Sequence, residues 1–389
     1  MSTFAIKSDE LVLPSGIDGF GYLVIKDGKF GGVSVERPSG MRVVDRVGCW
    51  VAPGFVDTHI HGFAGHDVMD CDADGLRAIS TELARRGTTS WLPTTLTAGT
   101  EETGEACASI AVASRAQRAE ERLAEARMQG VFLEGPFFTE AHKGAQNPRY
   151  LCDPDPAKLL DWQARADGLI CKSALAPERD GALEYIAAAT AAGVTACIGH
   201  SSATYGEAAA AVLAGARVVV HTFNGMDDMG HRDPGIVGCA MTSQGMFAEL
   251  ICDGQHVDPI ACEALVRAKG WEHVVLVTDC LRCGGLPDGR YEMGGLDIEL
   301  SGGVARLVEG GNLAGSTLTM VQAAHNVMSW GIVTAEQAIR MASEVPARSC
   351  GIADRCGAIL PGRDADLVVL DPSLNLVETY VGGRLVECV

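Results

Sequence analysis

Val51-Ala-Pro-Gly-Phe-Val-Asp-Thr-His-Ile-His61 is the stretch around which this chain is organised. It predicts a short apolar strand that ends in two histidines. Because residues i and i+2 of a strand point to the same side, His59 and His61 would project together. Two imidazoles aimed at one point suit a divalent metal such as zinc. A lone H-x-H carries little weight, since two unrelated histidines near a turn look the same, so the interpretation depends on further ligands elsewhere.

The composition indicates a folded protein and argues against binding to polyanions such as nucleic acids. The chain has 389 residues, of which 47% are hydrophobic and 21% charged, and its net charge is −19. The length allows two or three domains, or one large barrel with an appendage. The proportions of hydrophobic and charged residues are typical of a folded, soluble protein. The negative charge predicts no nucleic-acid partner, because polyanions would be repelled. An anionic substrate would therefore need a local cationic pocket.

The sequence also predicts a cytoplasmic protein without a membrane partner. The first ten residues lack a basic segment followed by an apolar core, and no apolar run approaches about 18 residues. The 14 cysteines are scattered without a repeated framework. We expect most of them to be reduced, buried, small apolar side chains.

Alternation of apolar strand candidates with alanine-rich helical stretches predicts a TIM-type (β/α)8 barrel, an α/β fold. The strand candidates are residues 54–59, 88–94, 128–134, 169–175, 194–200, 217–222, 247–252 and 273–278. The helical stretches are residues 74–86, 104–127, 179–192, 205–214 and 259–269. A doubly wound sheet is the competing fold, but no G-x-G-x-x-G or P-loop follows the first strands.

Short β-type runs separated by Gly, Asp and Pro turns occupy both ends of the chain. We predict that residues 1–52 and 357–389 together build one small β-sandwich domain. Residues 53–356 then form the barrel domain.

Chemistry in such a barrel lies at the C-terminal ends of the strands. Six metal-competent residues stand at or just beyond predicted strand ends: His59, His61, Glu134, His200, His221 and Asp279. Any one of them alone would be an ordinary polar residue at a strand terminus. Their coincidence at one end of the fold predicts a metal centre.

These residues and their flanking segments resemble the amidohydrolase superfamily of metal-dependent hydrolases and, within it, the N-acetylglucosamine-6-phosphate deacetylases. The matching segments are Pro53-Gly-Phe-Val-Asp57, Leu133-Glu-Gly-Pro-Phe137, His142-Lys-Gly-Ala-Gln-Asn-Pro148, Gly199-His-Ser, His221-Thr-Phe-Asn-Gly-Met226, Asp253-Gly-Gln-His256, Val277-Thr-Asp279 and Leu313-Ala-Gly-Ser316. The resemblance covers nearly the whole chain.

The resemblance implies a divalent metal, Zn²⁺ or Fe²⁺, with one or two ions per subunit. Glu134, His200 and His221 would hold the principal ion, with water in the open position. His59 and His61 would form a second site beside Asp279; the alternative is that this pair only hydrogen-bonds within the pocket. Asp279 would be the catalytic residue that takes a proton from water and passes it to the departing amine.

The resemblance also implies the substrate-binding residues. Phosphate would be bound by Asn224 with the Gly225 amide, by His256 and by Arg232, whose planar fork grips phosphate oxygens well. In the family this arginine reaches the neighbouring subunit's site, which implies a homodimer. The remaining substrate residues are Ala145 and Gln146, and Leu313, Ala314 and Gly315 of the loop that closes over the sugar.

Two features of the sequence raise specific questions. Gln146 stands where relatives commonly carry a histidine that helps to polarise the substrate carbonyl, and glutamine donates only a neutral hydrogen bond. We expect weaker polarisation, more reliance on the second metal, or a shifted substrate. Cys280-Leu-Arg-Cys283 directly follows Asp279, and we interpret these cysteines as space-filling residues that oxidation could reach.

The predicted reaction is removal of acetate from N-acetyl-D-glucosamine 6-phosphate in amino-sugar catabolism. The alternatives are the same reaction on N-acetyl-D-galactosamine 6-phosphate, or another amidohydrolase that opens a cyclic amide or acts on a base. A scaffold that has lost catalysis is disfavoured because all six candidate ligands are present.

Overall fold

The barrel is organised around β8 (Phe55–Ile60), in which every residue is buried. This computed structural model describes residues 3–120 and 123–389. β8 pairs in parallel with β11 (Thr88–Thr95) on one side. On its other side the ladder is reduced to one bridge, Ile60 to Cys280, beside a hydrogen bond of 2.8 Å from Asp279 N to His59 O. The segment with the two histidines therefore closes the barrel.

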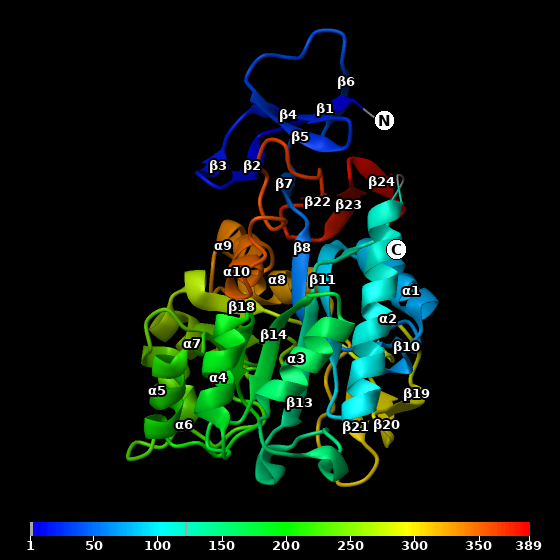
Figure 1. Ribbon diagram of the computed structural model, residues 1–389. Helices are drawn as coiled ribbons and strands as arrows, with labels where there is room; N and C mark the ends of the chain where they lie inside the picture. Colours follow the sequence, from blue (N-terminus) through cyan, green and yellow to red (C-terminus); the bar gives the residue numbers. More distant parts are fainter. Residues whose placement is uncertain (1–2, 121–122) are drawn as a thin grey trace.

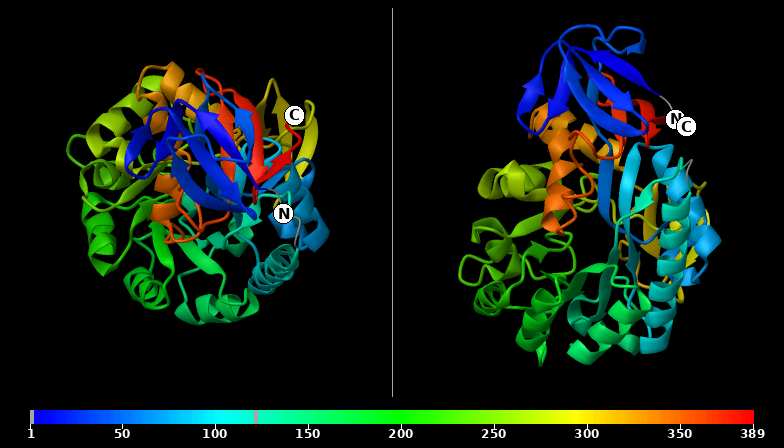
Figure 2. Two further views of the ribbon diagram at one scale, coloured as in Figure 1. Left: turned by 90° about the horizontal axis from the view of Figure 1, so that it is seen from above. Right: turned by 45° about the horizontal axis from the view of Figure 1, so that its top comes forward.

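The predicted (β/α)8 barrel is confirmed, with parallel strands in sequence order around it (Figures 1 and 2). After β8 and β11 the strands are β13 (Val131–Phe137), β14 (Ile170–Leu175), β15 (Thr195–Ile198), β16 (Val218–Val219), β17 (Phe247–Leu250) and β18 (Val274–Leu276), with the short β12 (Arg127–Met128) beside β11. The strands predicted at 194–200 and 217–222 end early. His200 and His221, near the predicted ends of these strands, have φ angles of +48° and +25° and so are no longer extended.

Helices surround the barrel, as the view from above in Figure 2 shows. They are α1 (Ala73–Ala84), α2 (Thr100–Ala119), α3 (Pro156–Arg165), α4 (Ala182–Ala191), α5 (Tyr205–Ala214), α6 (Gly235–Thr242), α7 (Pro259–Lys269), α8 (Met320–Ser329), α9 (Ala335–Met341) and α10 (Glu344–Ser349). Short 3₁₀ turns are η1 (Val68–Asp70), η2 (Glu140–His142), η3 (Pro148–Tyr150) and η4 (Trp271–His273). Helices α5 and α7 begin and end at the predicted residues. Thr204 and Asp258 cap their first turns, which explains where the two helices begin.

The structure differs from the predicted helices at α2 and α3. The helix expected over 104–127 begins earlier and ends at Ala119, and residues 127–128 form β12 instead. Residues 121 and 122 of that expected helix lie outside the described residues. Helix α3 was not predicted, although Asp155 followed by Pro156 is a start signal that would have located it.

Strands from both termini lie side by side at the top of Figure 1. One sheet has the order β5 (Lys29–Ser34), β4 (Gly21–Lys26), β1 (Phe4–Ser8), β6 (Arg42–Asp45). The other has the order β24 (Arg384–Val386), β23 (Leu376–Val381), β22 (Leu367–Leu370), β7 (Trp50–Pro53), β2 (Glu10–Leu13), β3 (Gly16–Asp18). Their apolar faces share one core that includes Ile6, Leu23 and Leu367. The division into domains at residues 52 and 357 stays a prediction.

A further sheet that the sequence analysis did not predict follows the last barrel strand. It consists of β19 (Gly289–Met293), β20 (Leu296–Ser301) and β21 (Val304–Leu307). Its inward residues pack on Leu96 and Leu281 in a separate apolar cluster. A small hairpin of β9 (Gly62–Phe63) and β10 (His66–Asp67) follows β8. The chain enters β8 from β7, so the C-terminal ends of the barrel strands lie away from the terminal sheets and on the side of β19–β21 (Figure 1).

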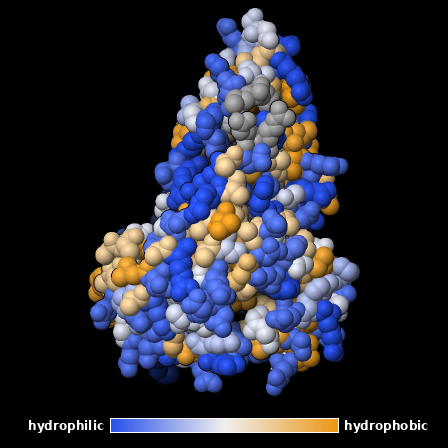
Figure 3. All heavy atoms as spheres, turned by 45° about the vertical axis from the view of Figure 1, so that its right-hand side comes forward, coloured by the Kyte–Doolittle hydropathy of each residue, from blue (hydrophilic) through white to orange (hydrophobic). Residues whose placement is uncertain are grey.

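The surface is mostly hydrophilic on the face drawn in Figure 3, where the terminal sheets form a narrow part above the broader barrel. Among the described residues, no helix combines the length and the apolar character that a membrane crossing requires.

We predict that Gly54→Ala destabilises the protein, because the first barrel strand needs a residue without a side chain at its start. A Cβ there would lie 2.1 Å from Thr89 Oγ1 and 2.7 Å from Thr89 Cβ, and Thr89 is itself buried. Overpacking of this kind costs about 1–3 kcal/mol. Urea unfolding followed by circular dichroism would measure it.

The matched control is Gly19→Ala, since a Cβ at this exposed glycine meets nothing within 4 Å. Equal unfolding midpoints for the two variants would contradict the prediction.

Candidate metal centre and substrate pocket

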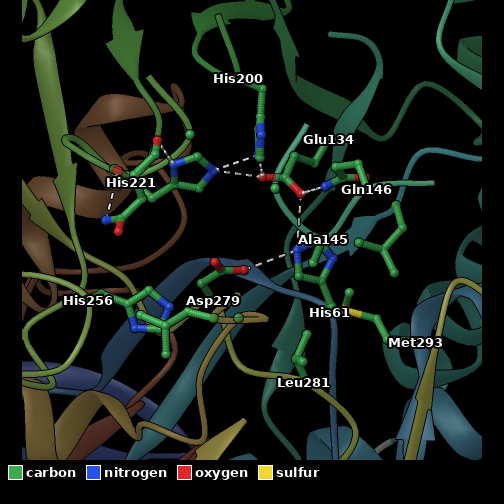
Figure 4. A pocket seen from close by; sticks show the side chains of 16 residues that line it. His61, Glu134, Ala145, Gln146, His200, His221, His256, Asp279, Leu281 and Met293 are labelled. Atoms are coloured by element: carbon green, nitrogen blue, oxygen red, sulfur yellow. Dashed lines mark hydrogen bonds and ion pairs between the residues drawn. The ribbon is translucent and has the colours of Figure 1, made fainter. Parts of the chain in front are cut away.

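The candidate ligands converge at the mouth of the barrel, and five of them face one another in Figure 4: His61, Glu134, His200, His221 and Asp279. His59 is the penultimate residue of β8 and His61 follows the strand, while Glu134 lies within β13. His200, His221 and Asp279 come shortly after β15, β16 and β18. All these side chains except that of Asp279, which is 13% exposed, are at least nine-tenths buried. The structure thus brings together all six residues that the sequence predicted as ligands.

The backbone is strained where three of these residues leave their strands. His200, His221 and Asp279 have φ angles of +48°, +25° and +50°, a region that residues other than glycine rarely adopt. Such conformations cost of the order of 1–3 kcal/mol and persist only where the surrounding structure imposes them. Here the turn after each strand directs the side chain into the pocket.

Each of the four histidines uses its Nδ1 atom for a fixed acceptor. These pairs are His59 with Glu249 Oε2 at 2.8 Å, His61 with Thr94 O at 3.1 Å, His200 with His142 O at 2.8 Å and His221 with Asn224 O at 3.1 Å. A carbonyl oxygen or an ionised carboxylate can only accept, so Nδ1 carries the proton. In the neutral ring Nε2 then has the lone pair, and it is Nε2 that faces the candidate carboxylates.

This arrangement requires a cation among the Nε2 atoms. The Nε2 atoms of His200 and His221 are 2.9 Å apart, and they lie 3.4 Å and 3.2 Å from Glu134 Oε1. Two lone pairs that face each other at this distance repel unless a proton or a metal ion lies between them. His59 Nε2 is buried and makes no hydrogen bond. The donor set of imidazole and carboxylate fits Zn²⁺ or Fe²⁺.

Two overlapping groups of residues could hold an ion. One is His59, His61 and Asp279, and the other is His59, Glu134 and His221. His61 Nε2 is 3.2 Å from both Glu134 Oε2 and Asp279 Oδ1. His59 Nε2 is 3.0 Å from Glu134 Oε1 and 3.6 Å from Asp279 Oδ1, so each carboxylate approaches both histidines of the H-x-H pair. By position His59 therefore lies between the two predicted ion sites.

The electrostatics favour positive charge in this cluster. Burial disfavours the charged form of His59, yet neighbouring carboxylates, Glu134 foremost, raise its pKa to about 9. Burial likewise opposes ionisation of Glu134, but the histidines around it hold its pKa well below the usual range. The pKa of Asp279 is also lowered, since His59 and His61 outweigh the effect of burial. Both carboxylates are therefore ionised at neutral pH and attract a cation.

Gln146 is held against a candidate ligand. Its Nε2 donates to Glu134 Oε2 at 2.6 Å, and its Oε1 accepts from Thr97 N at 2.8 Å. These two bonds fix the orientation of the amide and place it beside the metal centre, where it helps to orient Glu134. Its predicted role in polarising the substrate carbonyl stays a prediction.

A pocket of about 690 Å³, including its open mouth, lies above this cluster, within the range of small-molecule sites. Among the predicted substrate residues, those that line it are Ala145, Gln146, Asn224, Gly225, His256, Leu313 and Gly315. His256 is oriented by a bond of 2.7 Å between its Nδ1 and Asp253 Oδ2. Ala314 is buried behind the pocket wall in the apolar cluster under β19–β21. Arg232 is exposed on the loop after β16 and does not line the pocket of its own chain.

The sequence analysis missed several residues of the site. Leu96, Leu281 and Met293 form an apolar part of the pocket wall, and Met293 comes from the unpredicted sheet. Lys172 and Glu249 lie within buried strands below the ligands. A charged residue inside an otherwise apolar predicted strand was the signal that could have found both.

Cys280 and Cys283 are free, buried thiols. Burial raises the pKa of Cys280 well above its usual value and that of Cys283 to about 11. Both are therefore protonated at neutral pH, a state that disfavours reaction with oxidants and thiol reagents.

The fold is a (β/α)8 barrel whose mouth carries a cluster of residues that could hold a metal ion, an arrangement typical of metal-dependent hydrolases, and the comparison with known families agrees. The model of the amidohydrolase family matches residues 50–386. The chain belongs to this family.

Relatives within the family share most of the chain. The N-acetylglucosamine-6-phosphate deacetylase of Vibrio furnissii is 38% identical over 91% of this chain and 88% of its own length. The N-acetylgalactosamine-6-phosphate deacetylase of Escherichia coli O157:H7 is also 38% identical, over 98% of this chain and 99% of its own. A solved structure of a mutant N-acetyl-D-glucosamine-6-phosphate deacetylase from Mycobacterium smegmatis, in complex with N-acetyl-D-glucosamine-6-phosphate, is similar with a TM-score of 0.92 at 32% identity, covering 99% of this chain and 100% of that one.

We predict that His200→Ala removes the divalent ion held with Glu134 and His221 from the purified protein, because it deletes one of two Nε2 atoms that face each other beside Glu134. Inductively coupled plasma mass spectrometry would measure the metal content. His325→Ala is the control, since this histidine is bonded through Nδ1 to Ser373 O far from the pocket. Unchanged metal content in His200→Ala would refute the assignment.

Proposed function

We propose that this protein hydrolyses the acetamide of N-acetyl-D-glucosamine 6-phosphate and releases D-glucosamine 6-phosphate and acetate. The observation that carries the proposal is the convergence of four imidazole Nε2 atoms on two ionised carboxylates at the floor of the pocket. Polar groups of Asn224, Gly225 and His256 line the same pocket. The relatives from Vibrio furnissii and Mycobacterium smegmatis support this substrate.

We assign Glu134, His200 and His221 to a principal metal ion and His59, His61 and Asp279 to a second. A bound divalent cation would polarise the amide carbonyl and increase the acidity of water. Gln146 orients Glu134, and the four Nδ1 acceptors fix the ring orientations of the histidines. Such preorganisation is what a catalytic centre needs, because no reorganisation is then required during the reaction.

Asp279 transfers the proton in this proposal. Its lowered pKa keeps it ionised at neutral pH, so it can accept a proton from the attacking water. An amine leaves poorly unless it is protonated, and the same carboxyl group then delivers this proton to the departing nitrogen. The bond from Asp279 N to His59 O at 2.8 Å anchors its backbone to the first barrel strand, which fixes the position of the carboxylate.

The phosphate group needs more positive charge than one chain offers. No lysine or arginine is among the residues that line the pocket in the described chain, and His256 is paired with Asp253. Arg232 is exposed on the loop after β16, free to meet another molecule. We therefore assign phosphate binding to Asn224, Gly225 and His256 together with Arg232 of a second subunit, and the functional unit to a homodimer.

The galactosamine epimer is a second candidate substrate. It is favoured by the Escherichia coli O157:H7 relative, which is as similar to this chain as the relative from Vibrio furnissii. Acetate release from N-acetylglucosamine 6-phosphate, N-acetylgalactosamine 6-phosphate and unphosphorylated N-acetylglucosamine would decide between them. We expect the highest kcat/KM on the first. No acetate from any of them by metal-loaded protein would refute the proposal.

Asp279→Asn is predicted to lower kcat by about 10²–10⁴-fold, because the amide cannot shuttle the proton. Substrate binding, measured by calorimetry, should change little. Metal content is determined on the same sample, so that loss of an ion is distinguished from loss of the proton shuttle. A kcat close to that of the parent would refute the assigned role.

Arg232→Ala is predicted to raise KM with little change in kcat, since it removes only binding of the phosphate. Mixing and reassociating Arg232→Ala with Asp279→Asn subunits should restore activity that neither variant shows alone at low substrate concentration. In such a mixed dimer one site has an intact Asp279 and receives the partner's arginine. No recovery after demonstrated subunit exchange would contradict the assignment of Arg232 to the neighbouring site.

A further inference from the structure

A fully buried ion pair crosses the barrel interior below the metal centre. Lys172 lies on β14 and Glu249 on β17, strands that are separated in the sheet by β15 and β16. Both side chains are completely inaccessible to solvent, and the ammonium group of Lys172 is bonded to Glu249 Oε1. Neither residue lines the substrate pocket. The proposed reaction therefore leaves this pair without a function.

The contacts of the pair lead to the ligands. Glu249 Oε2 accepts from His59 Nδ1 at 2.8 Å and from His221 N at 3.2 Å. Lys172 Nζ donates to Thr58 O at 3.2 Å and lies 4.0 Å from the centre of the Phe132 ring. The Glu249 carboxylate thus holds the side chain of His59 and the backbone of His221, two of the candidate ligands.

A role in fold stability alone does not account for this arrangement. Buried ion pairs are often no more stabilising than apolar residues of similar volume. The other three candidate histidines orient their rings with backbone carbonyls, which carry no net charge. Among these four histidines, only His59 has a carboxylate as the acceptor of its Nδ1. A carboxylate acceptor both fixes the tautomer and raises the basicity of the opposite ring nitrogen. The lysine balances the charge that this acceptor brings into the barrel.

We propose that Glu249 is a positioning residue of the metal centre and that Lys172 is its counter-charge. The pair keeps the proton of His59 on Nδ1 and presents the lone pair of Nε2 to an ion held with His61 and Asp279. This inference rests on the proposed metal centre but not on the identity of the sugar, so it can fail while deacetylation stands.

Two double variants separate positioning from stability. Glu249→Met/Lys172→Met removes both charges and the acceptor, and methionine is flexible enough to fill the space. Glu249→Gln/Lys172→Met also removes both charges, but its amide oxygen still accepts from His59 Nδ1. His59→Ala gives the reference for complete loss of this ligand. Thermal unfolding of each metal-free protein establishes that it is folded.

The readout is titration of each metal-free protein with Co²⁺, whose visible absorption reports the ligands and the number of ions bound. We expect the Met/Met variant to bind Co²⁺ about 10–100-fold more weakly than the parent at the site that depends on His59. The Gln/Met variant keeps the acceptor without its negative charge, so its affinity should lie between those of the Met/Met variant and the parent. Parental affinity and stoichiometry in a folded Met/Met variant would overturn the proposal, as would a Gln/Met variant as weak as His59→Ala.

A measurement on the parent decides the question if the variants do not fold. In protein labelled with ¹⁵N-histidine and loaded with Zn²⁺, the His59 resonances are those missing in His59→Ala. We expect Nδ1 to carry the proton and Nε2 to be bound to metal. A proton on Nε2, or metal on Nδ1, would overturn the proposal.

Discussion

The orientation of four imidazole rings is the constraint on which the site depends. Each Nδ1 is committed to an acceptor on a barrel strand or on a segment that follows one, and so each Nε2 faces the pocket, where Glu134 and Asp279 are ionised. The same region closes the barrel, because Asp279 N donates to His59 O and Ile60 bridges to Cys280. Strand closure and ligand geometry are thus one set of contacts. A change that opens the barrel at β8 would also separate the ligands.

The barrel and the ligand set were predictable from local patterns. Alternating apolar strands and alanine-rich helices indicate β/α units, and the geometry of these units gathers the strand ends at one mouth. Glu134 and His200 are far apart in sequence, but each stands at the C-terminal end of a predicted barrel strand. Their meeting could therefore be predicted from the position of each residue in its own strand. The terminal sheets were recognisable in the same way, from short runs such as β22 with turn residues on either side.

What the sequence did not reveal are interactions between distant segments. The pairing of Lys172 with Glu249 across the barrel depends on the register of two strands that are not neighbours. The sequence around either residue does not predict which residue is its partner. Gln146 bonds to Glu134 only because the loop after β13 folds back over its own strand. The sheet β19–β21 follows the last barrel strand and does not share the barrel periodicity, although paired glycines at 294–295 and 302–303 mark its two hairpin turns.

The central claim is that a metal ion lies among Glu134, His200 and His221. Diffraction data collected above and below the absorption edge of the bound metal test it most directly. The account predicts an anomalous peak about 2.0–2.2 Å from Nε2 of both histidines and from one oxygen of Glu134. Metal-loaded protein with its peak elsewhere, or with the two rings turned so that Nδ1 faces the pocket, would contradict it.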